Sequence, residues 1–229
     1  MFSIAKMEFF QLFKGFKSIA IILMLLVPTY YFAKFSSMFE SAMELTPDEA
    51  DMAHSAGLLV VMVVFGQLFV MGLSHDTMNR ETYERTMRFL LTRTSRLSIV
   101  AGKFLGILAF WFACITASHV IIAIFSHRFD AFTFFQLMGL IACQVAFTVF
   151  LSTVVPVPAL TMFMSIIAGI LLPILGYWLA YTSNPWFSWM KYVDPNYYLV
   201  REDYTFLLMY LDAFILLLLT YVFFRRRGC

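Results

Sequence analysis

Glu81 and Glu84 stand three residues apart, and a pair of carboxylates can act as a general acid and a general base. Arginines surround this pair at positions 80, 85 and 88. Opposite charges at such spacing are typical of a solvated helix face held by salt bridges. We therefore predict that Glu81 and Glu84 lie on a solvated face, and that the chain is not an enzyme.

The sequence motifs of common nucleotide and hydrolase sites are absent. Gly102 and Lys103 lack the upstream glycine of a P-loop and are followed by Phe104, so we expect no ATP to bind through that motif. Neither G-x-S-x-G nor H-E-x-x-H occurs, which disfavours familiar intramembrane proteases. The cysteines are odd in number and show no C-x-x-C spacing, which disfavours a zinc site or a disulfide framework: Cys114, Cys143 and Cys229. We expect no catalytic residue, metal ligand or cofactor-binding residue in this chain.

Four polar side chains interrupt long apolar stretches: Gln67, His119, Gln144 and Asp212. Ionisable residues inside a membrane are costly and are functional candidates by default. Asp212 lies about 9 Å along its helix from the start of the apolar run, where it could reach the interface or pair with His119 or a partner helix. We predict that these four side chains line a translocation path. A hydrogen-bonded packing role is the open alternative.

The composition places these residues in a bilayer. Hydrophobic residues make up 62% of the 229 residues, against about 45–50% in soluble domains. Charged residues make up 13%, and the mean hydropathy is +0.82. A soluble globule of this size could not bury so much apolar surface, so a soluble enzyme, a disordered protein and a nucleic-acid binder are poor fits.

The apolar runs predict an all-α membrane protein with six spans in a single domain, residues 1–229. A spanning helix needs about 20 mostly apolar residues. The predicted spans are 18–33, 56–73, 99–125, 132–155, 159–181 and 206–224.

The basic residues predict the orientation. Twelve of the 16 precede span one, lie near the loop between spans two and three, or follow span six, the last group being Arg225, Arg226 and Arg227. The positive-inside rule then places both termini in the cytoplasm of a multi-pass protein of the cell membrane.

Three segments outside the spans have a pattern of their own. Residues 1–17 place phenylalanines on one helix face and lysines mostly on the other, which favours an interfacial helix over a continuation of span one. In the loop 76–98, Tyr83, Met87, Leu90 and Leu91 recur at helical spacing and predict a short amphipathic helix for a cytosolic partner. Residues 182–205 are rich in Trp and Tyr, which prefer the interface, and predict short outer helices that dip into the leaflet: they include Trp186, Trp189, Asp194, Pro195 and Tyr197.

The loop and the residues after it resemble the type-2 ABC transporter permeases. Those proteins carry an E-x-G-T-x-E-x-L-L-x-x-P-x-S-R-type run and then G-K between spans two and three. The chain retains Glu84, Thr86, Leu90, Leu91, Ser95, Arg96, Gly102 and Lys103. It departs from the pattern at Arg85, Arg88 and Thr94, where glycine, glutamate and proline are usual. The run Lys191 to Tyr198 is similar to the family's aromatic and proline-containing segment before the last span.

The resemblance implies a coupling helix that docks on a separate ATP-binding subunit, with ATP and Mg²⁺ bound there. It implies two copies of that subunit and a second permease, identical or homologous, with no nucleic acid as a partner. The coupling residues would be Glu84, Thr86, Met87, Leu90, Leu91 and Arg96. We expect outward transport of a hydrophobic or amphipathic substrate (a peptide, drug or lipid-like molecule) in a bacterial membrane, with antimicrobial peptide export favoured. A stand-alone ion-coupled transporter or channel is the alternative.

Overall fold

The computed structural model describes residues 1–36, 38, 47–182, 186, 189–201 and 203–226. The predictions for Arg227 and Cys229 lie outside these residues. The described part contains helices and no strand, which confirms the all-α prediction. The helices are α1 (Phe2–Lys14), α2 (Phe16–Lys34), α4 (Pro47–Ser74), α5 (Asn79–Tyr83), α6 (Met87–Arg93), α7 (Arg96–Ser126), α8 (Ala131–Val154), α9 (Pro158–Tyr181), α10 (Pro195–Val200) and α11 (Leu207–Arg226).

Six of these helices are long and apolar enough to cross a membrane, as predicted: α2, α4, α7, α8, α9 and α11. The largest difference from the predicted bounds is at α4, which begins at Pro47 and not near residue 56. Backbone hydrogen bonding continues beyond the apolar run, because a helix can extend into a polar environment without apolar side chains. Hydropathy therefore located the membrane-compatible part of α4 and missed its polar extension.

The predicted amino-terminal helix is separate from the first span. The backbone leaves helical geometry at Gly15, with φ −78° and ψ 132°, between α1 and α2. The helix packs along α7, where a Cβ added to Gly106 would lie 2.7 Å from the Ala5 carbonyl oxygen and from Glu8 Cβ. The G-x-x-x-G of residues 102–106 thus acts as a close-packing surface for α1.

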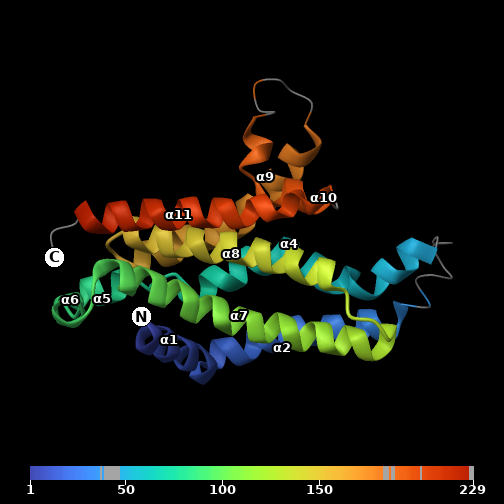
Figure 1. Cartoon of the computed structure of the whole chain (residues 1–229), viewed down its shortest axis with the longest axis horizontal. Helices are drawn as coiled ribbons and strands as arrows, with labels where there is room; N and C mark the ends of the chain where they lie inside the picture. Colours follow the sequence, from blue (N-terminus) through green and yellow to red (C-terminus); the bar gives the residue numbers. More distant parts are fainter. Residues whose placement is uncertain (37, 39–46, 183–185, 187–188, 202, 227–229) are drawn as a thin grey trace.

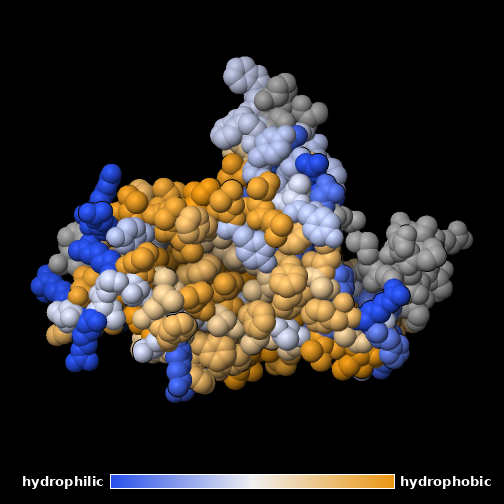
Figure 2. Space-filling model, in the orientation of Figure 1, coloured by the Kyte–Doolittle hydropathy of each residue, from blue (hydrophilic) through white to orange (hydrophobic). Residues whose placement is uncertain are grey.

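The core of the bundle lies around α8, which packs against α4, α7 and α11 and is mostly buried. By contrast, α9 and α11 expose most of their apolar side chains. Figure 2 shows a broad hydrophobic area across the middle of the visible face and hydrophilic residues at its ends. An exposed apolar area of this kind suits contact with lipid or with another membrane subunit.

One end of the bundle brings together several parts of the chain. Figure 1 shows the amino terminus, the described end of α11 and helices α5 and α6 toward the same end. Figure 2 shows strongly hydrophilic residues there. We call this the basic end, since its helices α1, α6 and the end of α11 carry Lys14, Arg88, Arg93 and Arg225.

The contact between α1 and α7 predicts opposite effects for two glycine substitutions. Gly106→Ala should destabilise the protein by about 1–3 kcal/mol, because its Cβ would collide with the backbone of α1. Gly72→Ala in α4 is the matched control, since a Cβ there meets no atom within 4 Å and alanine favours a helix by about 1 kcal/mol. Thermal unfolding of both variants in one detergent checks this. Equal unfolding temperatures would contradict the packing role of Gly106.

Candidate functional site

A buried ion cluster joins three elements at the basic end. Lys103 of α7 is fully buried, and its Nζ donates to Glu8 Oε1 of α1 at 2.6 Å. The same Nζ donates to Glu81 Oε1 of α5 at 2.7 Å. Interactions between charges removed from water are strong, and they constrain geometry because each hydrogen bond has a direction. The cluster therefore fixes α1, α5 and α7 relative to one another.

The position of Glu81 corrects the prediction that both loop glutamates lie on a solvated face. The Glu81 side chain is only 12% exposed, whereas Glu84 is exposed as predicted. The flanking arginines suggested surface ion pairs, yet the partner of Glu81 comes from α7, 22 residues later. Glu8 was missed altogether, because its cation lies 95 residues away. It is the only acidic residue among residues 1–17, and that was the available signal.

A second set of buried contacts ties α5 to the start of α9. The fully buried Asn79 donates from Nδ2 to the Val155 carbonyl oxygen at 3.1 Å and also to Thr161 Oγ1. Its backbone N–H donates to Ser152 Oγ of α8 at 3.2 Å. The short helix α5 is therefore anchored on α8 and α9 as well as on Lys103.

A left-handed residue separates α5 from α6. Arg85 has φ 60°, a conformation that glycine adopts freely and other L-residues adopt at a cost of about 1–2 kcal/mol. The turn is closed by Thr86, whose N–H and Oγ1 both donate to the Glu81 carbonyl oxygen, at 2.9 and 3.2 Å. The loop thus forms two short helices in place of the single amphipathic helix that the spacing predicted. The glycine expected here by resemblance to the permeases would relieve the strain.

The predicted coupling residues that precede Arg96 differ in how exposed they are. Glu84 and Thr86 are exposed on the loop. Met87 is buried, and Leu90 and Leu91 pack against the core while remaining partly exposed.

Arg96 connects the loop to the last span. Its Nη1 donates to the carbonyl oxygens of Phe224 and Arg225, both at 2.8 Å, and its guanidinium lies 5.6 Å from the Phe224 ring centre. A cation suits the C-terminal end of a helix, where carbonyls lack intrahelical partners.

Two aromatic residues are the prominent exposed apolar groups of the loop. Tyr83 is 68% exposed and Phe89 is 74% exposed. Phe89 was missed because it falls between the apolar positions of the helical pattern, on the side assigned to charged residues. An unpaired aromatic side chain beside exposed Arg85, Arg88 and Arg93 is the kind of anchor that protein interfaces bury.

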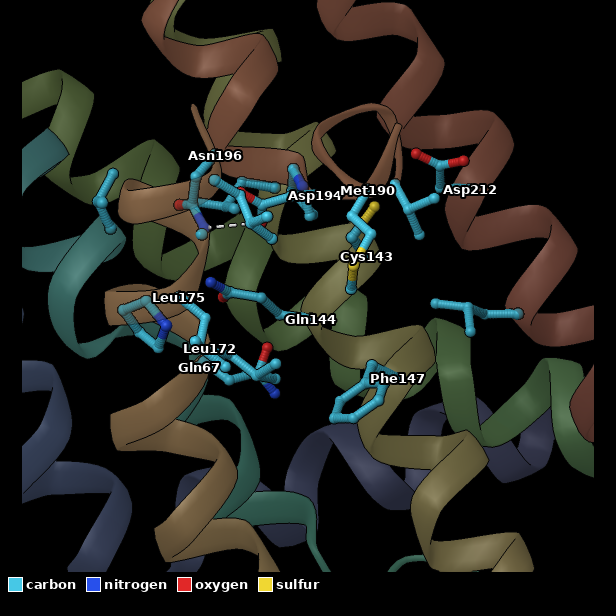
Figure 3. A pocket seen from close by; sticks show the side chains of 18 of the residues that line it. Gln67, Cys143, Gln144, Phe147, Leu172, Leu175, Met190, Asp194, Asn196 and Asp212 are labelled. Carbon is cyan, nitrogen blue, oxygen red and sulfur yellow. Dashed lines mark hydrogen bonds between the residues drawn. The ribbon is translucent and has the colours of Figure 1, made fainter. Parts of the chain in front are cut away.

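A second site is a cavity of about 570 Å³ between α4, α8, α9 and α11 and the segment around the start of α10. Figure 3 shows Gln67, Gln144 and Asp212 among its lining residues. Three of the four predicted path residues therefore meet at one cavity. Its walls are otherwise largely apolar, as in ligand pockets generally.

His119 is not one of the residues that line this cavity. It is buried in α7, where its Nδ1 lies 3.1 Å from the Ile115 carbonyl oxygen. Its ring packs on Phe129 and Phe134, with centroids 5.7 and 5.1 Å away. Pairing with His119 was one of three options for Asp212, and the described contacts of His119 are instead with Ile115, Phe129 and Phe134.

The outer segment contributes the remaining wall of the cavity. Trp189, Asp194 and Pro195 line it, whereas Trp186 is 84% exposed. Tyr197 lies instead beside two cations, with Lys191 Nζ and the Arg201 guanidinium each 5.5 Å from its ring centre.

Gly176 of α9 lets this segment approach. A Cβ added to Gly176 would lie 2.6 Å from Asp194 Oδ2. Short helices occur here at Met190–Tyr192 and Pro195–Val200, while their depth in the leaflet stays a prediction.

The model of the ABC-2 type transporter family matches residues 3–202 of the chain. The chain belongs to this family. A comparison with curated proteins finds no match. Membership makes the chain the membrane permease of an ABC transporter, a multi-pass transport subunit that is not itself catalytic. Permeases of the ABC-2 family generally work with an ATP-binding subunit.

The ion cluster of this ABC-2 permease predicts the effect of removing its cation. Lys103→Met should destabilise the protein by about 3–5 kcal/mol, because two buried carboxylates would lose their counter-charge. Adding Glu8→Gln and Glu81→Gln to Lys103→Met should restore most of the lost stability, because the two carboxylates that need a counter-charge are then removed. Lys14→Met, at an exposed position of α1, is the control. Thermal unfolding measures all four proteins, and a Lys103→Met protein as stable as the control would refute the structural role.

The left-handed residue of the loop gives another prediction. Arg85→Gly should leave stability unchanged or raise it by up to about 1 kcal/mol, since glycine tolerates φ 60°. Arg88→Gly, inside α6, should instead lower stability by about 1 kcal/mol. The same unfolding assay compares the two variants. A larger loss for Arg85→Gly than for Arg88→Gly would show that the turn does not govern stability here.

Proposed function

We propose that this permease exports a hydrophobic or amphipathic substrate through the cell membrane, driven by a separate ATPase. The observation that carries the proposal is the pair of exposed aromatic side chains, Tyr83 and Phe89, on a loop whose base is fixed to the spans by Lys103. Because the loop is held rigidly, a movement of a partner bound at these exposed side chains would be transmitted to the spanning helices. ATP and Mg²⁺ would bind to that partner.

The contacts of α5 supply a route from the loop to the cavity. Asn79 ties α5 to Thr161 at the start of α9, and the later part of α9 lines the cavity with Leu172, Leu175 and Gly176. Displacement of α5 would therefore act on one wall of the cavity through a continuous helix. The same displacement would act on α1 and α7 through the ion cluster.

The exposed faces of α9 and α11 support a second permease copy in the assembly. Leu175 is 47% exposed and Ile215 is 46% exposed, although both line the cavity. A second permease, identical or homologous, would cover these side chains and close the cavity on that side, with lipid around the rest of the apolar area. Two permeases with two ATPase subunits make the working unit.

The proposal also includes the orientation of the permease in the membrane and the direction of transport. The basic end would face the cytoplasm, as the positive-inside rule requires, and would place both chain ends there. The cavity would then lie toward the outer leaflet, where an amphipathic cargo leaves the protein. Bacterial export of an antimicrobial peptide, a drug or a lipid-like molecule fits this arrangement.

The test is capture of the ATPase in a mild detergent. The tagged wild-type chain should retain a P-loop ATPase in about equal amount, and Phe89→Ala should weaken the association roughly thirtyfold, because truncated aromatic anchors cost about 2 kcal/mol. Tyr83→Ala should act in the same direction.

Ile124→Ala is the matched control, since Ile124 is an apolar side chain that is 63% exposed and lies near the end of α7 away from the loop. Undiminished capture and ATP hydrolysis with Phe89→Ala would overturn the assignment of the docking surface. Transport by the chain alone, without ATP, would favour the ion-coupled alternative.

A further inference from the structure

The cavity between α4, α8, α9 and α11 contains polar atoms that the described residues leave without hydrogen-bond partners. They are Gln67 Nε2, Gln144 Oε1, Asp194 Oδ2 and Asp212 Oδ2, and all four side chains line the cavity. Figure 3 shows them on separate elements around the same space. Buried polar groups in folded proteins are generally paired, so four unpaired groups at one cavity point to a partner from outside the chain.

The two glutamines are the more deeply buried members of this group. Gln67 and Gln144 are each only 6% exposed, and they come from the adjacent helices α4 and α8. A Cβ added to Gly66 would lie 3.0 Å from Gln144 Oε1, which places the Gln144 amide directly against α4. Each glutamine can donate and accept, so the pair suits a polar group of either hydrogen-bonding character.

The two aspartates give the cavity its charge. No lysine or arginine lines the cavity, and the described part of the chain shows no ion pair for Asp194 or Asp212. The nearby Lys191 contacts the rings of Tyr192 and Tyr197, and Arg201 pairs with Asp203 at 3.5 Å. Among the described residues, the lining of the cavity is thus acidic and contains no lysine or arginine.

Asp194 and Asp212 both line this cavity. Cys143 lines it as well, and its thiol donates to the Met209 carbonyl oxygen of α11 at 2.9 Å. Asp194 Oδ1 accepts from Asn196 Nδ2 at 3.0 Å, which leaves Oδ2 for a ligand. Burial raises the pKa of Asp194, and a bound cation would favour its ionised form.

The remaining walls suit an apolar body. Leu172, Leu175, Phe147 and Ile215 surround the space, and about 570 Å³ lies within the range of small-molecule sites. Trp189 also lines the cavity, and the face of an indole ring attracts a cation. A ligand that satisfies all of these features has a charged head and a hydrophobic remainder.

We propose that the cavity binds an organic cation with an apolar body, its positive charge held by Asp194 and Asp212 and its body against α8, α9 and α11. This inference rests on the proposed export function, because such a cation would belong to the class of substrates that the permease exports. The binding itself requires no ATPase.

Equilibrium dialysis of the full-length permease in phosphatidylcholine nanodiscs tests the proposal with two ions of equal shape. Tetraphenylphosphonium is the cationic probe and tetraphenylborate the anionic one, each measured separately with empty nanodiscs as background. Wild-type protein should bind the cation saturably and the anion far more weakly. Asp212→Asn and Asp194→Asn should each weaken cation binding about tenfold, because a partner of a desolvated charge pair is lost.

Asp203→Asn is the matched control, since Asp203 is a half-exposed carboxylate of the same outer segment that lies outside the cavity. Unchanged cation binding in the Asp194→Asn, Asp212→Asn double variant, with unfolding temperature retained, would overturn the proposal. So would equal affinity for the anion. Failure to capture an ATPase would count against the export function and leave this result standing, since the nanodiscs contain the permease alone.

Discussion

The structure depends on one buried charge, the ammonium of Lys103. It has no exposed surface, and its Nζ donates hydrogen bonds to the carboxylates of Glu8 in α1 and Glu81 in α5, at 2.6 and 2.7 Å. Burying a charge is favourable only when partners replace its water, so each of the three groups requires the others. The amino-terminal helix, the loop and the third span are consequently one mechanical unit, in which the loop cannot shift without moving α1 or breaking the cluster.

The sequence predicted the parts of the molecule that depend on local pattern. Apolar runs of sufficient length identified the six spanning helices. Gln67, Gln144 and Asp212 were singled out because polar groups in apolar runs are costly, and they do meet at one cavity. Each of these signals is contained within about 20 residues.

What the sequence could not predict depends on contacts between distant elements. The partners of Lys103 are 95 and 22 residues away, so the spacing of Glu81 from its neighbouring arginines was misleading. Phe89 lies on the exposed side of α6, opposite the buried Met87, where the helical pattern led us to expect charged residues, so an aromatic anchor there was not recognised. His119 was grouped with Asp212 by residue type alone, whereas the packing of α7 places it among aromatic rings.

The contact of Arg96 with the end of α11 has a consequence for biosynthesis. Its guanidinium binds the Phe224 carbonyl oxygen, 128 residues later in the chain. During translation the loop leaves the ribosome long before that carbonyl exists, so the base of the loop stays incomplete until the sixth span has been made and inserted. The proposed docking surface for the ATPase would therefore be completed last. A chain arrested before α11 would present its partner with an incomplete surface, and subunit assembly would wait until the sixth span is in place.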